Sequence, residues 1–397
     1  MTVILIFKGI FMNRFVEKHT FGAQALQGFC AALYIFPLTL SVSVLSGVGV
    51  FAGAFAGVIG CLLCAVGKTM YAPCWMLFMP AFFMIKEFGT GFAFLAMLIG
   101  GLLFLIVHLV LQKNNIKIEL TDAAKAGLAL GAAFLATVIL TKDYFGIAAS
   151  GNTAIEMLKS YRSNGFHANW RGVLYGTITL VIMITWPRKF RTFKKYLPAP
   201  FMALLIPLVF NMLLNREAYR TPVYETGEYA IADLSVLFNF SANEHPWWML
   251  ALTGIGFCVC LFAVNAFFGT TKEDNTGFAV GNVLVSPFCL PMRSYEFGKT
   301  GLVGGLVGAA TVVALSCVFP LVSRMPTHSM AVVLITLGWQ SVPWGLIAKS
   351  FKGGAKEITA VLLVFLCFIF ADPIVAFLPP FVSFFDRRKE ESFCVES

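Results

Sequence analysis

Apolar runs of roughly twenty residues recur along this chain, and they restrict the fold more than any other feature. The first two are Gln27–Leu45 and Val48–Val66. A helix of that length crosses about 30 Å of hydrocarbon, and helices satisfy their backbone groups internally in lipid. The chain is 58% hydrophobic and 12% charged, which is more apolar than a water-soluble core can accommodate. The sequence therefore predicts an all-α polytopic membrane protein.

Two of the apolar regions are interrupted. Gly67–Ile85 contains Lys68 and two prolines, and the Gly-rich Gly277–Phe297 contains two further prolines. We interpret each as a short extended piece joined to a half-helix, which makes about fourteen membrane elements in total. The remaining predicted spans are Phe92–Leu111, Ala123–Leu140, Val173–Trp186, Pro200–Leu214, Trp247–Phe268, Leu302–Val322, Ala331–Ile347, Ile358–Phe370 and Pro373–Phe385.

The charged residues predict the orientation. With Lys8, Arg14 and Lys18 in the cytoplasm, the basic clusters at 188–195, 349–356 and 387–389 also fall inside. The acidic residues of the segment before Trp247 fall outside. This is the positive-inside pattern, so the net charge of +9 indicates topology and not nucleic-acid binding. We expect a plasma membrane protein, in bacteria of the inner membrane, with both termini cytoplasmic and lipid around it.

Counting elements predicts internal symmetry. We expect a cytoplasmic segment 1–24, a first repeat 25–214, an extracytoplasmic connection 215–246, a second repeat 247–386 and a cytoplasmic tail 387–397. The broken elements are the third of each repeat, that is the third and tenth overall. An odd number of elements per repeat inverts the second relative to the first. Matching broken helices in two inverted halves mark the central binding site of a secondary transporter.

Few residues in these spans can carry chemistry. Pro73 suits the first turn of a half-helix, and Arg293 with Ser294 follows Pro291 at the second break. A cation beside helix N-termini favours an anion. Glu296 is a candidate for coupling, or for neutralising Arg293. The alternative for Arg293 is that its side chain extends to the membrane interface.

Polar side chains in the first and eighth spans are further candidates. Thr39 and Ser41, beside Pro37, have hydroxyls that either contact substrate or bond to the preceding helical turn. Asn265 is isolated among apolar residues and either contacts substrate or joins helices. Aromatic residues that line the site or simply pack are Tyr71, Trp75, Phe78 and Phe267.

The sequence lacks the motifs of common enzymes. It has no H-E-x-x-H, no G-x-S-x-G and no P-loop. Most of the ten cysteines lie in apolar runs, where they act as small apolar residues, so we expect no metal site and no cofactor. We expect a secondary transporter or channel and not an enzyme.

Several stretches resemble the SulP anion permeases, which share the inverted-repeat fold of the uracil permease. They are "LYIFPLTLSVSVLSGVGVFAGAFAGVIGCLL", "YAPCW", "FKKYLPAPFMALLIPLVFNMLL", "TGEYAIADLSVLF", "MRSYEFGKTG", "RMPTHSMAVVLITLG" and "FADPIVAF". Their order and spacing, from about Gly22 to Phe385, carry the resemblance. It implies a small inorganic or carboxylate anion such as sulfate, bicarbonate or a dicarboxylate. It also implies an elevator-like core that moves against a gate, and a homodimer.

The resemblance also implies a set of substrate-binding residues. These are Pro37, Thr39, Ser41, Tyr71, Ala72, Pro73, Cys74, Asn265, Met292, Arg293 and Ser294. Asn265 stands where many relatives have a carboxylate, which weakens the case for proton coupling through that span; Na⁺ and H⁺ both remain candidate coupling ions. Since only Arg387–Ser397 follow the last predicted span, we expect the regulatory domain that ends many relatives to be absent.

Two other functions stay open at this point. Nucleobase permeases use a Y-x-E-N element, and Tyr295 with Glu296 is one residue off that spacing. A membrane scaffold or motor-like subunit without transport is the third reading. Uptake of labelled anions and bases separates these three.

Overall fold

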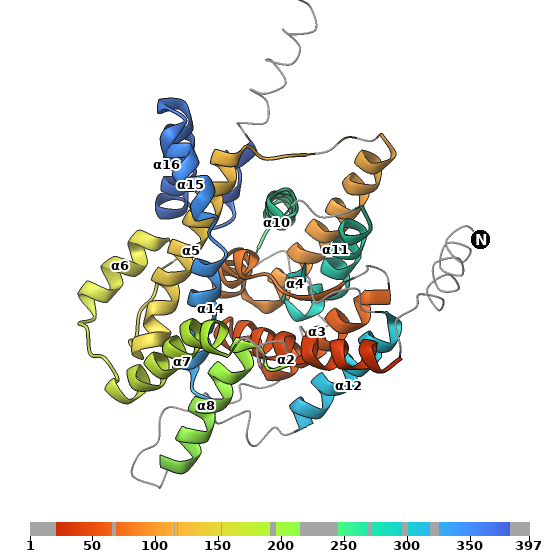
Figure 1. Ribbon diagram of the computed structural model, residues 1–397. Coiled ribbons are helices and arrows are strands. Elements are labelled where there is room, and N and C mark those ends of the chain that lie inside the picture. The colour runs from red at the N-terminus through yellow and green to blue at the C-terminus, as the bar shows by residue number, and fades with distance from the viewer. Residues whose placement is uncertain are drawn as a thin grey trace, which may run out of the picture.

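The structure is a computed structural model in which most of the chain is helical (Figure 1). It describes residues 21–65, 69–114, 116, 118–151, 153–190, 196–214, 245–268, 272–295, 301–317 and 325–381. Glu296, most of the predicted connection 215–246 and the predicted tail 387–397 lie outside these residues.

The helices confirm the all-α polytopic class. They are α2 (Phe21–Leu45), α3 (Val50–Leu62), α4 (Trp75–Lys113), α5 (Asp122–Phe145), α6 (Ala154–Ser163), α7 (Trp170–Lys189), α8 (Ala199–Leu214), α10 (Trp247–Phe268), α11 (Lys272–Leu284), α12 (Leu302–Cys317), α14 (Thr327–Gln340), α15 (Trp344–Lys352) and α16 (Ala355–Phe370). Among the described residues, four helices are long and apolar enough to cross a membrane, and a bent pair makes a fifth. Three shorter apolar helices accompany them. The strands of the described chain are β1 (Met70–Pro73) and β2 (Met292–Tyr295).

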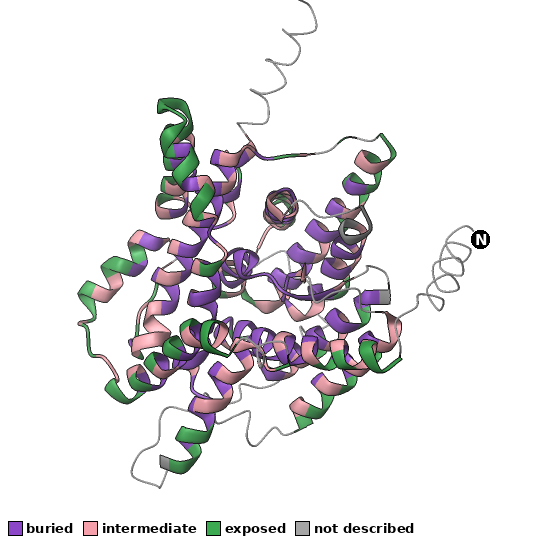
Figure 2. Cartoon of the chain, viewed as in Figure 1, coloured by how far each residue is buried: buried purple, intermediate pink, exposed green. Residues whose placement is uncertain are grey.

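The helices pack in two groups. One contains α2, α3, α4, α10, α11 and α12, and the other contains α5, α7, α8, α14 and α16 (Figure 1). The groups touch where α14 and α8 pack on α2 and where α5 meets α4. Buried residues concentrate along α2, α14 and the start of α4, whereas most residues of α6 and α16 are exposed or partly buried (Figure 2).

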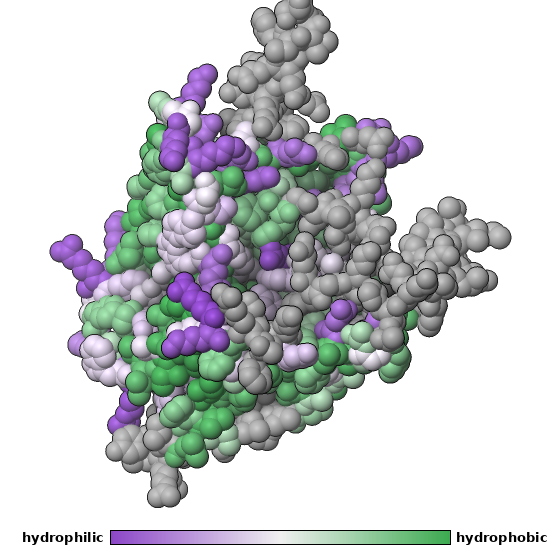
Figure 3. Space-filling model, in the orientation of Figure 1, coloured by the Kyte–Doolittle hydropathy of each residue, from purple (hydrophilic) through white to green (hydrophobic). Residues whose placement is uncertain are grey.

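The surface fits a lipid environment. The face seen in Figure 3 is largely hydrophobic, and its hydrophilic residues gather in a few separate clusters. Large side chains such as Leu363 and Phe370 of α16 are half or more exposed. Water would not tolerate this much apolar surface on a monomer, but a bilayer does. The protein is therefore an integral membrane protein.

Glycines let the first group pack with backbones in contact. A Cβ added to Gly28 of α2 would overlap the carbonyl oxygen of Gly304 in α12. A Cβ on Gly60 of α3 would overlap the carbonyl oxygen of Tyr71 in β1. Small residues at such crossings replace the hydrophobic effect, which lipid cannot supply between helices.

The first interrupted region is confirmed as an extended piece followed by a helix. β1 ends at Pro73 and α4 starts at Trp75. The helix then continues into the predicted span Phe92–Leu111, with a break at Gly89. Gly89 has φ 85°, a left-handed conformation that glycine adopts without strain.

The second interrupted region differs from the prediction. Helix α11 already covers residues 272–284, so the extended piece follows a helix inside this region and does not open it. The run from Lys272 to Leu284 contains no proline, which explains the uninterrupted helix. Pro287 and Pro291 fall in the 3₁₀ turn Ser286–Phe288 and just before β2. The strict correspondence of the two repeats therefore stays a prediction.

Three further elements were mispredicted. The run Ala331–Ile347 is two helices, α14 and α15, bent by 42° around Pro343. The described part of Pro373–Phe385 forms the 3₁₀ turns Val375–Phe377 and Pro379–Phe381. The consecutive prolines Pro379 and Pro380 prevent a continuous helix through this run. Helix α6 was not predicted. It is short and polar, and the capping box of Thr153 and Glu156 starts it.

Candidate functional site

The two interrupted regions meet in a small antiparallel sheet. β1 pairs with β2 so that Ala72 lies opposite Arg293 and Pro73 opposite Met292. Tyr71 lies opposite Ser294 in the same ladder. The structure thus brings together the predicted residues of the first break, Tyr71 to Cys74, and those of the second, Met292 to Ser294.

Two sets of hydrogen bonds stabilise the place where β1 pairs with β2, which we call the crossing. The backbone N–H of Cys74 donates to the carbonyl oxygen of Pro291 at 2.9 Å. The buried amide of Asn282 in α11 accepts from the N–H of Met292 and donates to its carbonyl oxygen, both at 3.0 Å. Sequence reasoning missed Asn282. An amide in the apolar run "VGNVLV" was the signal, because a buried amide must find partners.

A helix N-terminus opens at the crossing. Cys74 is the N-cap of α4, and its own side chain makes no capping hydrogen bond. The first N–H groups of a helix have no intrahelical partners, and the positive end of the helix dipole lies there. Pro73 is the last residue of β1 and not part of the first helical turn, which corrects that prediction. Proline is tolerated there because each strand of a two-stranded sheet is an edge strand.

Arg293 lies in the middle of this arrangement, although not at a half-helix N-terminus as predicted. It belongs to β2. Its Cζ is 3.7 Å from the ring centroid of Phe268 in α10 and 4.1 Å from that of Tyr295. Phe267, one of the aromatic residues predicted to line the site or to pack, makes an edge contact with Phe268. The Nε atom of Arg293 is buried and has no hydrogen-bond partner among the described residues.

Tyr295 links the crossing to a cavity. Its hydroxyl donates to the carbonyl oxygen of Pro73 at 3.2 Å, and its ring is 5.4 Å from that of Tyr34 in α2. Tyr34 lines a cavity of about 630 Å³ between the two helix groups. Its polar lining includes Gln27, Tyr196 and Gln340. This cavity provides an approach to the site, and sequence reasoning did not predict it.

The hydroxyls of the first span bond to their own helix. Thr39 donates to the carbonyl oxygen of Phe36 at 2.9 Å, and Ser41 donates to that of Pro37 at 2.7 Å. Both side chains are fully buried. Each hydroxyl has one proton, so neither can donate to an anion without first releasing its bond within the helix.

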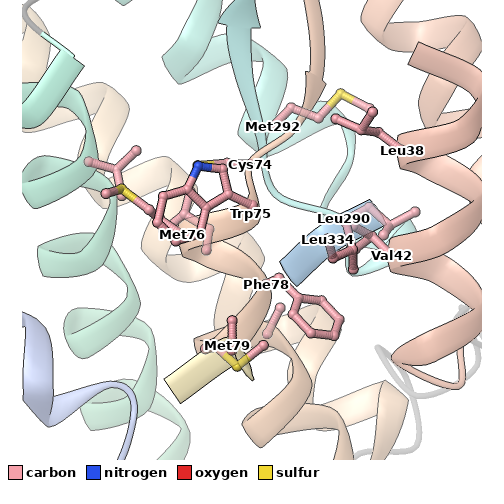
Figure 4. Close-up of a cluster of buried hydrophobic side chains, with 14 of the residues drawn as sticks. Leu38, Val42, Cys74, Trp75, Met76, Phe78, Met79, Leu290, Met292 and Leu334 are labelled. Carbon is pink, nitrogen blue, oxygen red and sulfur yellow. The ribbon is translucent and has the colours of Figure 1, made fainter. Parts of the chain in front are cut away.

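Apolar side chains pack beside the crossing. Figure 4 shows Met292 beside Leu38 of α2, with Trp75 and Phe78 of α4 packed below the junction. Trp75 and Phe78 are both buried in this cluster. Asn265 is partly buried in α10, three residues before Phe268. Within the described chain, no three His, Cys, Asp or Glu side chains gather as metal ligands would.

No family model and no curated protein matches the sequence of the chain. Solved structures match its fold. The transmembrane domain of the cyanobacterial bicarbonate transporter BicA superposes with a TM-score of 0.69 at 18% identity, covering 90% of this chain and 96% of that one. SLC26A9 gives a TM-score of 0.65 at 10% identity, over 90% of this chain and 64% of that one.

A third structure agrees. Murine Slc26a9, an anion transporter in the inward-facing state, gives a TM-score of 0.66 at 10% identity over 92% of this chain and 68% of that one. The chain thus spans about two thirds of the SLC26A9 chain and nearly all of the BicA transmembrane domain. It has the fold of these transmembrane domains, which confirms the fold implied by the resemblance to the SulP permeases.

Proposed function

We propose that this protein is a membrane transporter of a small anion, bound where β1 and β2 cross. The observation that carries the proposal is the pairing of Ala72 with Arg293, which sets a guanidinium beside the N-terminus of α4. Charge and helix dipole have the same sign there, so both favour an anion. The two structural neighbours described as anion transporters, BicA and Slc26a9, support the same substrate class.

The mechanism that we propose is alternating access. The group of helices around α2, α4 and α10 acts as the moving core, and the group around α5, α7 and α14 acts as the gate. The cavity beside Tyr34 lies between the two groups, as an elevator requires. With both termini cytoplasmic, this cavity opens toward the cytoplasm, because it is lined by the first half of α2.

The proposal also covers the substrate, the driving ion, the oligomeric state and the membrane. The substrate is sulfate, bicarbonate or a dicarboxylate, driven by Na⁺, by H⁺ or by exchange. The protein works as a homodimer in the plasma membrane, which in bacteria is the inner membrane. A Na⁺ gradient and a pH gradient, imposed separately on liposomes, identify the driving ion.

Uptake into liposomes tests the function. Labelled sulfate, bicarbonate, oxalate, fumarate and uracil are offered to the wild type, to Arg293→Ala and to Arg162→Ala. The last is a matched control, because Arg162 is exposed on α6, away from the crossing. Removing one charge-assisted contact costs about 1.5–3 kcal/mol, so Arg293→Ala should lower anion uptake at limiting concentration by at least roughly tenfold.

Three results would oppose the proposal. Anion uptake that is equal in Arg293→Ala and Arg162→Ala would remove Arg293 from the site. Uracil uptake that survives Arg293→Ala and stops in Glu296→Gln would make the protein a nucleobase permease. A scaffold without transport would take up none of the five compounds.

A further inference from the structure

The guanidinium of Arg293 is held between two aromatic rings. Its Cζ lies 3.7 Å from the centroid of Phe268 and 4.1 Å from that of Tyr295. These separations are close to the van der Waals contact of flat groups, about 3.5–4.0 Å between carbon atoms. The guanidinium carbon is therefore in contact with both rings.

This stacking leaves the edges of the guanidinium for a ligand. All its N–H donors point outward in its own plane. Nε is buried without a hydrogen-bond partner among the described residues, and a donor left in this state is costly unless a ligand satisfies it. Ala72, which pairs with Arg293 across the ladder, offers no polar side-chain atom to this donor.

The rings also restrict the shape of that ligand. A carboxylate-like oxyanion accepts two parallel N–H bonds and lies in the plane of the guanidinium. A tetrahedral oxyanion keeps oxygens outside that plane, on the sides where the rings lie. The face of an aromatic ring carries negative charge density and repels them. A halide is a single atom, so it cannot offer two separate acceptor atoms to the two parallel N–H groups.

We propose that the stacked Arg293 makes this a site for planar oxyanions, such as bicarbonate and small carboxylates, in preference to sulfate and halides. Phe268 is the residue that determines the selectivity, because it closes one face of the guanidinium without offering a polar atom. The inference rests on the proposed anion site and narrows its substrate class.

Calorimetric titration of the purified protein in detergent tests this without requiring transport. The probes are formate, nitrate and bicarbonate against sulfate and chloride, at matched ionic strength. The variants are Phe268→Leu, which keeps apolar volume but removes the flat face, and Arg293→Lys, which keeps the charge but removes the plane. Phe262→Leu is the matched control: it lies in the same helix, and its ring packs on Phe104 instead of Arg293.

The wild type and Phe262→Leu should bind the planar anions at least tenfold more tightly than sulfate or chloride. Phe268→Leu should reduce this ratio several-fold, and Arg293→Lys should bring it close to one. A wild type that binds sulfate or chloride as tightly as formate overturns the inference while the anion site stands. A preference unchanged in both variants overturns the role of the stacked guanidinium. Absence of binding by every anion overturns the inference together with the proposed site.

Discussion

Ala72 and Arg293 are directly paired residues of the antiparallel ladder between β1 and β2. Directly opposed residues project to the same side of a sheet, with Cβ atoms about 4.5–5.5 Å apart. One comes from the first interrupted region of the sequence and the other from the second. A substitution at Ala72 therefore places a new side chain beside Arg293 and tests whether Arg293 binds the anion.

Ala72→Glu should supply Arg293 with an internal counter-ion. An opposite-charge pair directly across a ladder is favourable, so the new carboxylate should occupy the guanidinium and exclude the transported anion. We expect uptake to fall at least roughly tenfold below that of Ala72→Gln, as loss of a charge-assisted bond of about 1.5–3 kcal/mol predicts. Uptake into liposomes measures this.

Ala72→Gln is the control for size, since it has nearly the same shape without the charge. Thermal unfolding should place Ala72→Glu at or above Ala72→Gln, because its charge is paired. Equal uptake by the two variants would show that the charge of Arg293 does not contribute to binding.

Asn282→Ala should loosen β2. The amide of Asn282 satisfies both backbone groups of Met292 at 3.0 Å. Each buried polar group left without a partner costs about 1–3 kcal/mol. We expect a lower melting temperature together with a lower uptake rate, since Arg293 follows Met292 directly.

Asn282→Asp separates the two bonds. As a carboxylate it still accepts from the N–H of Met292 but cannot donate to the carbonyl oxygen. Its melting temperature should not exceed that of the wild type. If Asn282→Ala kept the wild-type melting temperature, the two hydrogen bonds from Asn282 to Met292 would not stabilise β2.

Much of this arrangement could be predicted, and the reason is local. Proline and lysine in the apolar run Gly67–Ile85 indicate a broken span, because each disturbs a helix in lipid. The same reasoning identified Arg293 as a functional candidate, since a charge within the membrane needs a purpose. These signals predicted where the site lies, near Tyr71–Cys74 and Met292–Ser294.

The partners within the site could not be predicted, because they depend on three-dimensional packing. Phe267 and Phe268 are adjacent, but successive residues on a helix point about 100° apart, and only Phe268 stacks on Arg293. The chain turns at Ser286–Phe288, between Asn282 and Met292, and the two residues are hydrogen-bonded to each other. Periodicity does not encode such contacts. The helix start at Trp75, two residues after Pro73, likewise depends on the pairing of β1.

Gly28→Ala should destabilise the protein. A Cβ at this position would overlap the carbonyl oxygen of Gly304, so α2 and α12 would have to move apart. Overpacking of this kind costs about 1–3 kcal/mol. Thermal unfolding in detergent, followed by size-exclusion chromatography, measures the loss.

Gly22→Ala is the matched control in the same helix. Nothing lies within 4 Å of a Cβ added there. Alanine is the better helix former by up to about 1 kcal/mol, so this variant should melt at or slightly above the wild-type temperature. If both variants melt alike, α2 and α12 are not in contact through Gly28.

Lys86→Ala should favour closure of the cavity beside Tyr34. Lys86, near the end of the first part of α4, donates to the carbonyl oxygen of Gly151 at 2.8 Å, between α5 and α6. This bond joins the two helix groups at residues that do not line the cavity. A bond to an exposed charge contributes about 0.5–1 kcal/mol, so we expect a two- to fivefold shift.

Alkylation of Cys30, which lines the cavity, reports the shift by peptide mass spectrometry. The rate should fall in Lys86→Ala and stay unchanged in Lys159→Ala, an exposed lysine on α6. A rate that rises or stays constant in Lys86→Ala would show that this contact does not hold the two groups in their present position.

The central claim is that a transported anion binds beside Arg293 at the crossing of β1 and β2. A cryo-electron microscopy structure of the protein in lipid nanodiscs with saturating bicarbonate tests it most directly. We predict density for a planar ligand within hydrogen-bonding distance of the Arg293 guanidinium, near the first turn of α4, and no such density in Arg293→Ala. Density at another position, in a protein that transports the anion, would contradict the account.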